Sequence, residues 1–514
     1  MNKIKDFFGN KWVGFALASI LYVLWFVVWT GNWWLLLGVA VIYDLYISKY
    51  FYRYVWSKNE ELCEKYSTYK SVYEWVNAIV FATVVATIIH IFFFQMYVIP
   101  SSSMEKTLLV GDYLYVSKVT YGPKMPNTPL SFPFVHHTMP LSTTKKSFSE
   151  AIKWPYKRLK GLRDIERNDV VVFNFPAGDT VLLENQAVTY YDVLREYQAE
   201  YGEKRGREEL EKAYTIISRP VDKRENYIKR CVALPGDVIK IVDTELFIND
   251  EPQVQIPEKQ YCYTIRTSSP LSAYAIENMG ITEMSGNGNY YFSPLTEAMV
   301  EKLLKMDNII SVERYKAEEQ CFPHSDRYAW SADNMGPLWI PEAGATIELN
   351  EDTWPLYERI IDVYEDNDVE VRDGAYYING EKADTYTFKM NYYWMMGDNR
   401  HNSADSRYWV LCPRTTLSAR PHSFGCHQIR IRVSPKTFAG SVYSPKLDKT
   451  ESKWSKSKIV ISPLRVMRRQ SSRSVAANFS AMHSTLRARR RLRPAWSLCI
   501  NVTTMLRITA MLGV

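Results

Sequence analysis

Three serines follow the last long apolar segment near the start of the chain, in the run VIPSSSM at residues 98–104. A cluster of this kind usually forms a turn or caps a helix, because Ser hydroxyls bond nearby backbone groups. Its position points to chemistry instead. A small-residue turn just above a bilayer, flanked by Ile99, Pro100, Met104 and Leu108, can form an apolar cleft for a peptide leaving the membrane. The serine hydroxyls are therefore candidate nucleophiles.

A lysine among apolar neighbours is the candidate base. Lys229 lies in the run YIKRCVALPGD at residues 227–237, whose pattern predicts a strand. The alternative is a lysine on the solvent face of that strand. Burial would lower the pKa of the amine and let it act as a general base. A Ser/Lys pair is a known substitute for Ser-His-Asp. The Ser/Lys pair is favoured here because none of the candidate histidines lies beside a nucleophile-type serine motif. These candidates are His136, His137, His324 and His401.

A third polar run, MGDNRHNSADSRYW at residues 396–409, combines Gly with dense Asp, Asn, Ser and Arg. Such a composition usually forms a hydrogen-bonded loop. The same residue types also suit a set of contacts that fixes the orientation of a catalytic base.

The three runs together, in this order after apolar segments, resemble the serine, lysine and Gly-Asp-Asn-Arg motifs of bacterial type I signal peptidases, also called leader peptidases. The resemblance covers residues 75–409, with a divergent insertion at 245–390. It implies a mainly β catalytic domain with a signal-peptidase-like Ser/Lys protease fold, N-terminal transmembrane α-helices and an inserted α+β cap region. It also implies a serine endopeptidase that removes signal peptides from exported preproteins through an acyl-enzyme, with no cofactor and no metal.

The resemblance assigns a role to each matched residue. Ser103 would be the nucleophile and Lys229 the general base. The Ser101 hydroxyl and the Ser103 backbone N–H would bind the oxyanion, and Ser403 would hold the Lys229 amine. Two ion pairs would support the site: Asp405 with Arg407, and Asp398 with Arg230. Shallow pockets for small substrate residues, at the first and third positions before the cut, would be lined by Ile99, Pro100, Met104, Leu108 and Tyr227.

Two departures from the family pattern stand out. His401 occupies a position where the family usually has Asp, and Glu105-Lys106 replaces a more apolar or proline-containing stretch. We expect both changes to lie at the solvent-exposed edge of the site, where they would leave the chemistry intact.

Two other readings compete with this one. A self-cleaving repressor-type protease shares the Ser/Lys logic but needs a DNA-binding helix-turn-helix, and the apolar segments argue against it. A membrane-anchored, non-enzymatic binding protein, whose β-domain only displays loops, remains the alternative from a different class.

Three apolar stretches precede the catalytic motifs, at residues 12–30, 33–50 and 75–98. Each approaches the roughly 20 residues that cross a bilayer as a helix. Only Gly31 and Asn32 separate the first two, which predicts a helical hairpin rather than a cleaved signal peptide. Lysines and arginines concentrate before residue 12 and in the loop 50–74, and none lies in the hairpin turn.

By the positive-inside rule this distribution predicts a multi-pass protein of the bacterial plasma (inner) membrane, with a cytoplasmic loop at 50–74 and the catalytic domain on the outer, periplasmic face. The expected partners are signal peptides of secreted preproteins, the lipid bilayer and the secretion translocon.

Beyond residue 98 the chain shows short β-like runs, for example at 113–116, 169–174, 237–241 and 369–371. Asn379-Gly380 predicts a type I′ hairpin. Helix-favouring stretches at 182–217 and 294–306 predict surface insertions. The expected division is a membrane anchor at 1–98, a first part of the catalytic core at 99–244, an inserted region at 245–390, a second part of the core at 391–409, and a tail at 410–514.

The charge is unevenly distributed. The whole chain carries +7, but residues 410–514 contain 20 Lys/Arg and 2 Asp/Glu, which leaves residues 1–409 at −11. An acidic body makes nucleic acid an unexpected partner. Seven cysteines without a C-x-x-C pair argue against a structural metal site. Cys262 and Cys321 would be either a disulfide or two buried thiols, and we favour the thiols.

The tail departs from the family ending. If one G is missing after the Trp409 codon, codons compatible with residues 410 onward read in the restored frame as GFVPEDHIVGKA and further family-like sequence, with a stop near Lys449. We therefore interpret residues 410–514 as a frameshift product without a selected fold. An intact G run in the DNA, with the long tail found in the native protein by mass spectrometry, would refute this.

Overall fold

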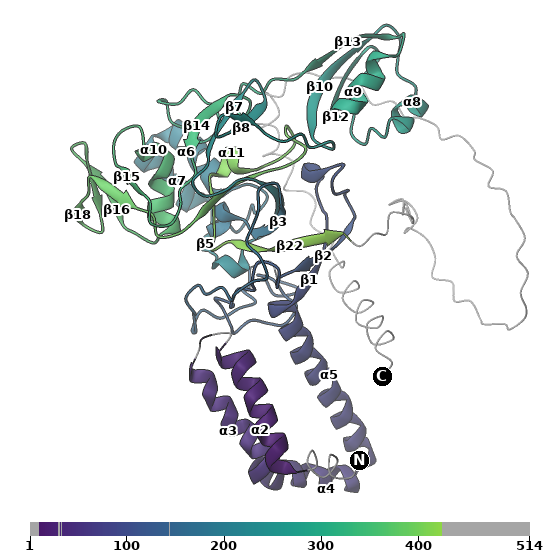
Figure 1. The fold of residues 1–514 in the computed structure, drawn as a ribbon, viewed down its shortest axis with the longest axis vertical. Helices are drawn as coiled ribbons and strands as arrows, with labels where there is room; N and C mark the ends of the chain where they lie inside the picture. The colour runs from purple at the N-terminus through teal and green to yellow at the C-terminus, as the bar shows by residue number, and fades with distance from the viewer. Residues whose placement is uncertain (1–9, 29–30, 32, 143, 424–514) are drawn as a thin grey trace, which may run out of the picture. The chain divides into compact units, whose positions relative to one another are not determined.

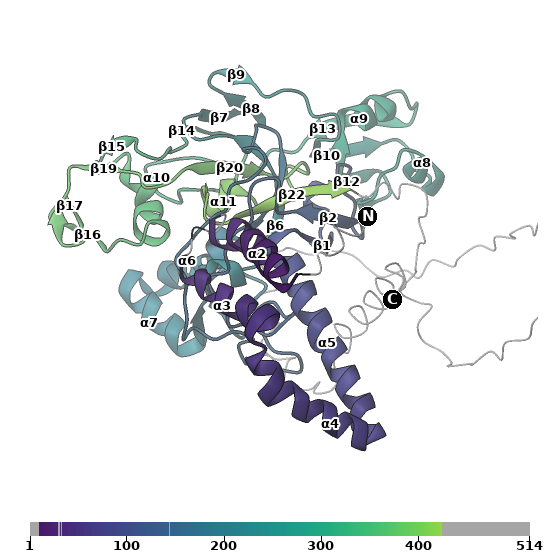
Figure 2. The same cartoon turned by 60° about the horizontal axis from the view of Figure 1, so that its bottom comes forward.

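The computed structural model describes residues 10–28, 31, 33–142 and 144–423 (Figures 1 and 2). The first part of the chain is helical. Its helices are α2 (Lys11–Tyr22), η1 (Val23–Val28), η2 (Trp33–Leu36), α3 (Leu37–Tyr43), η3 (Asp44–Ser48), η4 (Tyr52–Trp56), α4 (Ser57–Lys65) and α5 (Ser67–Phe92). Within the described residues, two segments are long and apolar enough to cross a membrane: Lys11–Val28 and Ser67–Phe92.

The expected spans differ from these helices in two places. The second apolar helix, Leu37–Ser48, is shorter than the roughly 20 residues a span needs. The third begins earlier than expected and ends at Phe92, because Phe94–Val98 forms strand β1. An apolar run of this kind suits a helix or a buried strand, and pairing with β2 decides for the strand.

A seven-stranded antiparallel sheet carries the candidate site, in the order β1-β2-β22-β3-β6-β20-β21. Its strands are β1 (Phe94–Val98), β2 (Tyr113–Ser117), β3 (Val170–Asn174), β6 (Asn226–Ala233), β20 (Tyr392–Met396), β21 (Cys412–Pro413) and β22 (Leu417–Ser423). β6 lies between β3 and β20, with Val171 opposite Lys229 and Met395 opposite Cys231. The sheets confirm the mainly β fold class expected for the catalytic domain.

A second sheet has the order β14-β7-β8-β9. Its strands are β7 (Val238–Val242), β8 (Glu245–Ile248), β9 (Glu251–Pro252) and β14 (Met335–Trp339). Side chains of β7, β8 and β14 share one core with Trp394 of β20 and Ile360. The boundary expected at residue 245 is therefore wrong, because β8 pairs directly with β7 across a tight turn.

Residues 260–314 form a module that we call the cap module. It contains a four-stranded sheet in the order β11-β12-β10-β13. Its elements are β10 (Gln260–Thr267), α8 (Ala273–Asn278), β11 (Ser285–Asn287), β12 (Tyr290–Thr296), α9 (Glu297–Leu304) and β13 (Ile309–Arg314). Tyr261, Ile265, Leu295 and Leu303 belong to a core separate from the other sheets. Figure 1 shows α8 and α9 beside these strands.

The remaining elements are short. They are η5 (Ser102–Met104), η6 (Pro176–Asp179), β4 (Thr180–Leu182), α6 (Tyr190–Tyr201), α7 (Glu203–Ala213), β5 (Ile216–Ser218), η7 (Val221–Lys223), β15 (Thr346–Glu348), α10 (Trp354–Arg359), η8 (Ile360–Tyr364), β16 (Val369–Arg372), β17 (Ala375–Ile378), β18 (Glu381–Lys382), β19 (Thr385–Thr387) and α11 (Ser406–Trp409). Both helix-favouring stretches are helical. Asn379 and Gly380 both have positive φ, 54° and 83°, as a type I′ turn requires.

The first residues of the expected tail belong to the fold. β22 lies between β2 and β3, and Leu417 and Ala419 are buried there. An unstructured tail that starts at residue 410 is therefore wrong for residues 410–423. Backbone pairing depends little on side-chain identity, and these small or apolar residues fill the available space. The rest of the expected tail, residues 424–514, lies outside the described residues.

Candidate active site

Ser103 and Lys229 meet, although 126 positions separate them. Lys229 projects from β6 and Ser103 lies in the 3₁₀ helix η5, shortly after β1. The Nζ atom of Lys229 lies 2.7 Å from the Oγ atom of Ser103 and donates to the Ile228 carbonyl at 3.0 Å. The two residues are only 7% and 4% exposed. A nucleophile and a base are thus in direct hydrogen-bonding distance, shielded from water.

Burial changes the protonation of this lysine. It lowers the pKa of the Lys229 amine to about 8, against the opposing attraction of Asp405 and Asp398. The ring of Tyr227 covers one side of the amine, with its centroid 5.6 Å from Nζ. A substantial neutral fraction therefore exists slightly above neutral pH, and that form has a lone pair for the Ser103 proton.

A second hydroxyl lies beside the nucleophile. The Oγ atoms of Ser101 and Ser103 are 3.5 Å apart. Ser101 has an extended backbone and is exposed, so its hydroxyl can turn towards a bound carbonyl. This placement suits an oxyanion donor.

Two ion pairs with buried carboxylates lie close to the catalytic dyad, which is the pair Ser103 and Lys229. Asp398 accepts two hydrogen bonds from Arg230, at 2.8 and 2.6 Å. Asp405 accepts two from Arg407, both at 2.8 Å. Burial raises the pKa of the Asp405 carboxyl, but the Arg407 charge and hydrogen bonds outweigh this and hold that pKa below its ordinary value. The Asp405 carboxylate therefore stays ionised.

The expected contact of Ser403 with the Lys229 amine is absent. The Oγ atom of Ser403 is buried without a hydrogen-bond partner among the described residues. It lies against Gly397 instead, where a Cβ would come within 2.2 Å of Ser403 Oγ and 2.6 Å of the Ser103 carbonyl oxygen. Only glycine permits this approach of two backbone segments. Rotation about one Ser403 side-chain bond decides where its hydroxyl points, and sequence spacing does not specify that rotation.

Residues outside the expected set hold the serine segment in place. The backbone N–H of Asn399 donates to the Ser103 carbonyl and its side-chain amide to the Ser102 carbonyl, both at 3.1 Å. Thr107 donates to Asp398 at 2.6 Å. Sequence reasoning missed both roles, although Asn399 lies inside the third motif and Thr107 follows the serine motif closely.

His401 and Glu105 are not at a solvent-exposed edge, whereas Lys106 is partly exposed. The His401 side chain is only 3% exposed, and its Nδ1 atom accepts the Cys262 backbone N–H at 3.0 Å. Its Nε2 atom therefore carries the proton and donates to Asp333 at 2.9 Å. Glu105 is also buried, at 4% exposure. The expectation of exposure was based on the polarity of these residues. It was wrong because a polar group can be buried when it has hydrogen-bond or charge partners.

Lys106 extends from the serine segment to the cap module. Its backbone has a φ of +72°, and its Nζ atom donates to the Gly280 carbonyl at 2.6 Å. Nearby, the Asn402 side chain donates to Ser102 Oγ and to Glu283 of the cap module, both at 3.0 Å. The cap module thus contacts both the serine segment and the loop that supports it.

The expected substrate-lining residues divide into two groups. Ile99, Met104 and Leu108 are buried in one core cluster behind Ser103. Pro100 is exposed, and Tyr227 stacks on Phe175 with a centroid distance of 4.3 Å. In the described conformation Ile99, Met104 and Leu108 are packed together in the core and do not line an open pocket.

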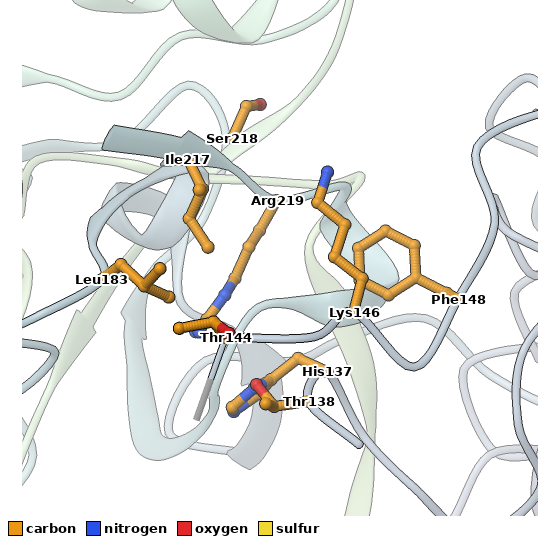
Figure 3. Close-up of a pocket in the computed structure, with 9 residues that line it drawn as sticks. All are labelled: His137, Thr138, Thr144, Lys146, Phe148, Leu183, Ile217, Ser218 and Arg219. Atoms are coloured by element: carbon orange, nitrogen blue, oxygen red, sulfur yellow. The ribbon is translucent and has the colours of Figure 1, made fainter. Parts of the chain in front are cut away.

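The pocket in Figure 3 is elsewhere. It is lined by His137, Thr138, Thr144, Lys146, Phe148, Leu183, Ile217, Ser218 and Arg219. None of these belongs to the three motifs, so we do not associate this pocket with the dyad. Cys262 and Cys321 are separate, buried thiols, as favoured above.

Comparison with known proteins gives one family. Residues 72–280 and 381–423 match the family model described as "Signal peptidase, peptidase S26". Curated relatives include signal peptidase I of Rickettsia prowazekii (strain Madrid E), 23% identical over 266 residues, which are 52% of this chain and 70% of the relative. Signal peptidase I of Rickettsia massiliae (strain Mtu5) is 24% identical over 51% of this chain and 68% of the relative. That of Rickettsia typhi (strain ATCC VR-144 / Wilmington) is 24% identical over 52% and 71%.

Proposed function

The chain belongs to the signal peptidase family, peptidase S26, and we propose from this premise that it removes signal peptides from exported preproteins with Ser103 as nucleophile and Lys229 as general base. It is a serine endopeptidase of the type I class. The observation that carries the residue assignment is the 2.7 Å distance between Lys229 Nζ and Ser103 Oγ in a buried setting.

The reaction follows from this geometry. Ser103 Oγ attacks the scissile carbonyl carbon as its proton passes to the neutral Lys229 amine. The Ser103 backbone N–H and the Ser101 hydroxyl bind the oxyanion. Collapse of the tetrahedral intermediate expels the amino terminus of the mature protein, which takes the proton from Lys229. Water deprotonated by Lys229 then hydrolyses the ester and releases the signal peptide.

The surrounding residues hold this arrangement. Asp405 and Asp398 are each paired with an arginine, which offsets part of their attraction for the protonated Lys229 amine. Ile99, Met104 and Leu108 support the substrate backbone from behind, and Pro100 and Tyr227 contact its side chains. The Ser403 hydroxyl lies against Gly397 without a hydrogen-bond partner among the described residues, and we propose that its side chain rotates to hold the Lys229 amine once substrate binds.

We further infer the cellular setting. The helices Lys11–Val28 and Ser67–Phe92 anchor the chain in the plasma membrane. The shorter apolar helix Leu37–Ser48 returns the chain to the cytoplasmic side, and the basic residues of the loop 50–74 keep that loop in the cytoplasm. The catalytic domain then works on the outer face, where preproteins leave the secretion translocon.

Cleavage of a preprotein by purified Ser103→Ala and Lys229→Ala variants tests the residue assignment. We expect each variant to lose about 10⁴-fold or more in kcat, because the two residues act as one unit. Ser218→Ala, in the unrelated strand β5, is the matched control and should cleave normally. Unchanged processing by both dyad variants would overturn the assignment and favour a non-enzymatic binding protein.

A further inference from the structure

We propose that the loop formed by residues 125–142 and 144–162, which we call the basic loop, lies in the headgroup region of an anionic membrane and holds the catalytic domain against the bilayer. The loop connects β2 to β3 and contributes none of the site residues. The proposal rests on the membrane anchoring inferred above, and it adds a second, non-spanning contact with lipid.

The basic loop exposes large apolar side chains. Phe132 is 53% exposed, Leu162 81% and Leu141 fully exposed. The other exposed apolar residues of the loop are Leu130, Phe134, Ile152, Trp154 and Tyr156. This many exposed apolar side chains on one loop is unusual for a surface that meets only water.

The charge of the loop suits a negatively charged lipid surface. Its exposed lysines are Lys145, Lys146, Lys153, Lys157 and Lys160, and its only acidic residue is Glu150. This is a basic island on a body, residues 1–409, with a net charge of −11. Trp, Tyr and Lys together are typical of the membrane interface, where apolar stems enter the lipid and polar ends remain hydrated. Clustered lysines add attraction to anionic headgroups.

Two contacts place the loop at the level where the apolar helices end. The ring of Phe134 packs edge-on against His90, in the last turn of α5, at 5.5 Å between centroids. A Cβ on Gly31, in the turn between the first two apolar helices, would lie 2.8 Å from Lys157 Nζ. The loop therefore contacts the last turn of α5 and the turn at Gly31, which lie on the same side of the bilayer. Lipid headgroups lie at this level.

Contacts within the loop, and one contact with the rest of the catalytic domain, hold the loop in this shape. Within the loop, Ser131 forms a β-bridge with Phe148, and Thr138 forms one with Lys146. The hydroxyl of Thr128 donates to Asp222 at 2.9 Å. The apolar side chains are thus presented by a folded scaffold, so that insertion into the interface needs little additional ordering.

Fluorescence quenching in the full-length protein tests the proposal. An environment-sensitive fluorescent amino acid is placed at position 132 and, as a matched control, at position 274 of the cap module, where Tyr274 is 75% exposed. Each protein is reconstituted into phosphatidylcholine vesicles with or without about 30% phosphatidylglycerol. The quencher is a lipid that carries its spin label at a shallow depth, near the headgroups.

We expect strong quenching at position 132, greater with phosphatidylglycerol, and no quenching at position 274. Lys153→Glu with Lys157→Glu should remove the dependence on phosphatidylglycerol. Equal signals at the two positions, or no quenching at position 132, would overturn the proposal. Cleavage of a soluble peptide in detergent is measured on the same samples, so that a failure of the protease assignment is recognised separately.

Discussion

At the scale of single residues, the site depends on neutral and charged groups that are buried side by side. Lys229 has a depressed pKa because it is buried, whereas Asp405 remains ionised because Arg407 meets it with two hydrogen bonds. The same low-dielectric surroundings thus favour the neutral amine and tolerate the paired charge. This division of roles allows a lysine to act as a base without a histidine.

The Asp405–Arg407 pair leads to a stability prediction. Asp405→Asn leaves the buried Arg407 guanidinium without a counter-charge, and we expect a loss of about 3–5 kcal/mol in the free energy of unfolding. Denaturant unfolding measures this. Glu370→Gln removes the exposed partner of Arg372 and is the control, with no resolvable change expected. A similar small effect at both positions would show that Asp405 does not carry the structural role assigned to it.

At the scale of elements, the serine segment is held between the supporting loop and the cap module. Lys106 has a backbone conformation that proline cannot adopt, because proline fixes φ near −65°. The residue that departs from the family pattern therefore makes a contact with Gly280 that a proline there could not make. We infer that this chain uses the cap module to position its nucleophile.

Replacing Lys106 tests this positioning role. Lys106→Ala removes the bond to Gly280, and we expect kcat/KM to fall about 2- to 10-fold, the value of one hydrogen bond. Lys106→Arg keeps a donor and should recover most of the rate. Since the Lys229 pKa is set elsewhere, the pH profile should not move. A shifted profile, or equal rates in all three proteins, would contradict a purely positioning role.

The sequence predicted the helices, strands and turns that have a local signal. It did not predict those whose structure depends on pairing with a distant segment. The Asn379-Gly380 turn and the strand around Lys229 have short-range signatures, and the structure contains both. Residues 94–98 were misassigned because an apolar run continues a helix equally well until β2 pairs with it. Within the site, the resemblance to the signal peptidase motifs indicated which residues meet, but the hydroxyl direction of Ser403 depends on packing that only the folded chain defines.

At the scale of the whole molecule, the catalytic sheet pairs strands from the beginning and the end of the catalytic domain. β22, near residue 420, is inserted between β2 and β3, which precede it by about 250 positions or more. The catalytic domain therefore includes residues up to at least Ser423, whatever the origin of the coding sequence beyond Trp409. The frameshift interpretation of the tail remains a prediction that DNA sequencing decides.

Two truncations test the extent of the fold. A chain ending at residue 423 retains β22, and we expect it to fold and to cleave a preprotein. A chain ending at residue 409 exposes the hydrogen-bonding edges of β2 and β3 and loses the buried Leu417 and Ala419, so we expect it to be insoluble or inactive. Thermal unfolding and cleavage distinguish them. Equal activity of the two proteins would show that β22 is dispensable.

The central claim is that a neutral Lys229 amine takes the proton of Ser103, and the pH dependence of kcat/KM tests it most directly. The account predicts a rate that rises with pH as the amine loses its proton, with a midpoint near 8. Lys229→Ala should abolish the rise together with the activity. A midpoint at about 6.5, the ordinary range of histidine, or a rise that persists in Lys229→Ala, would contradict the account.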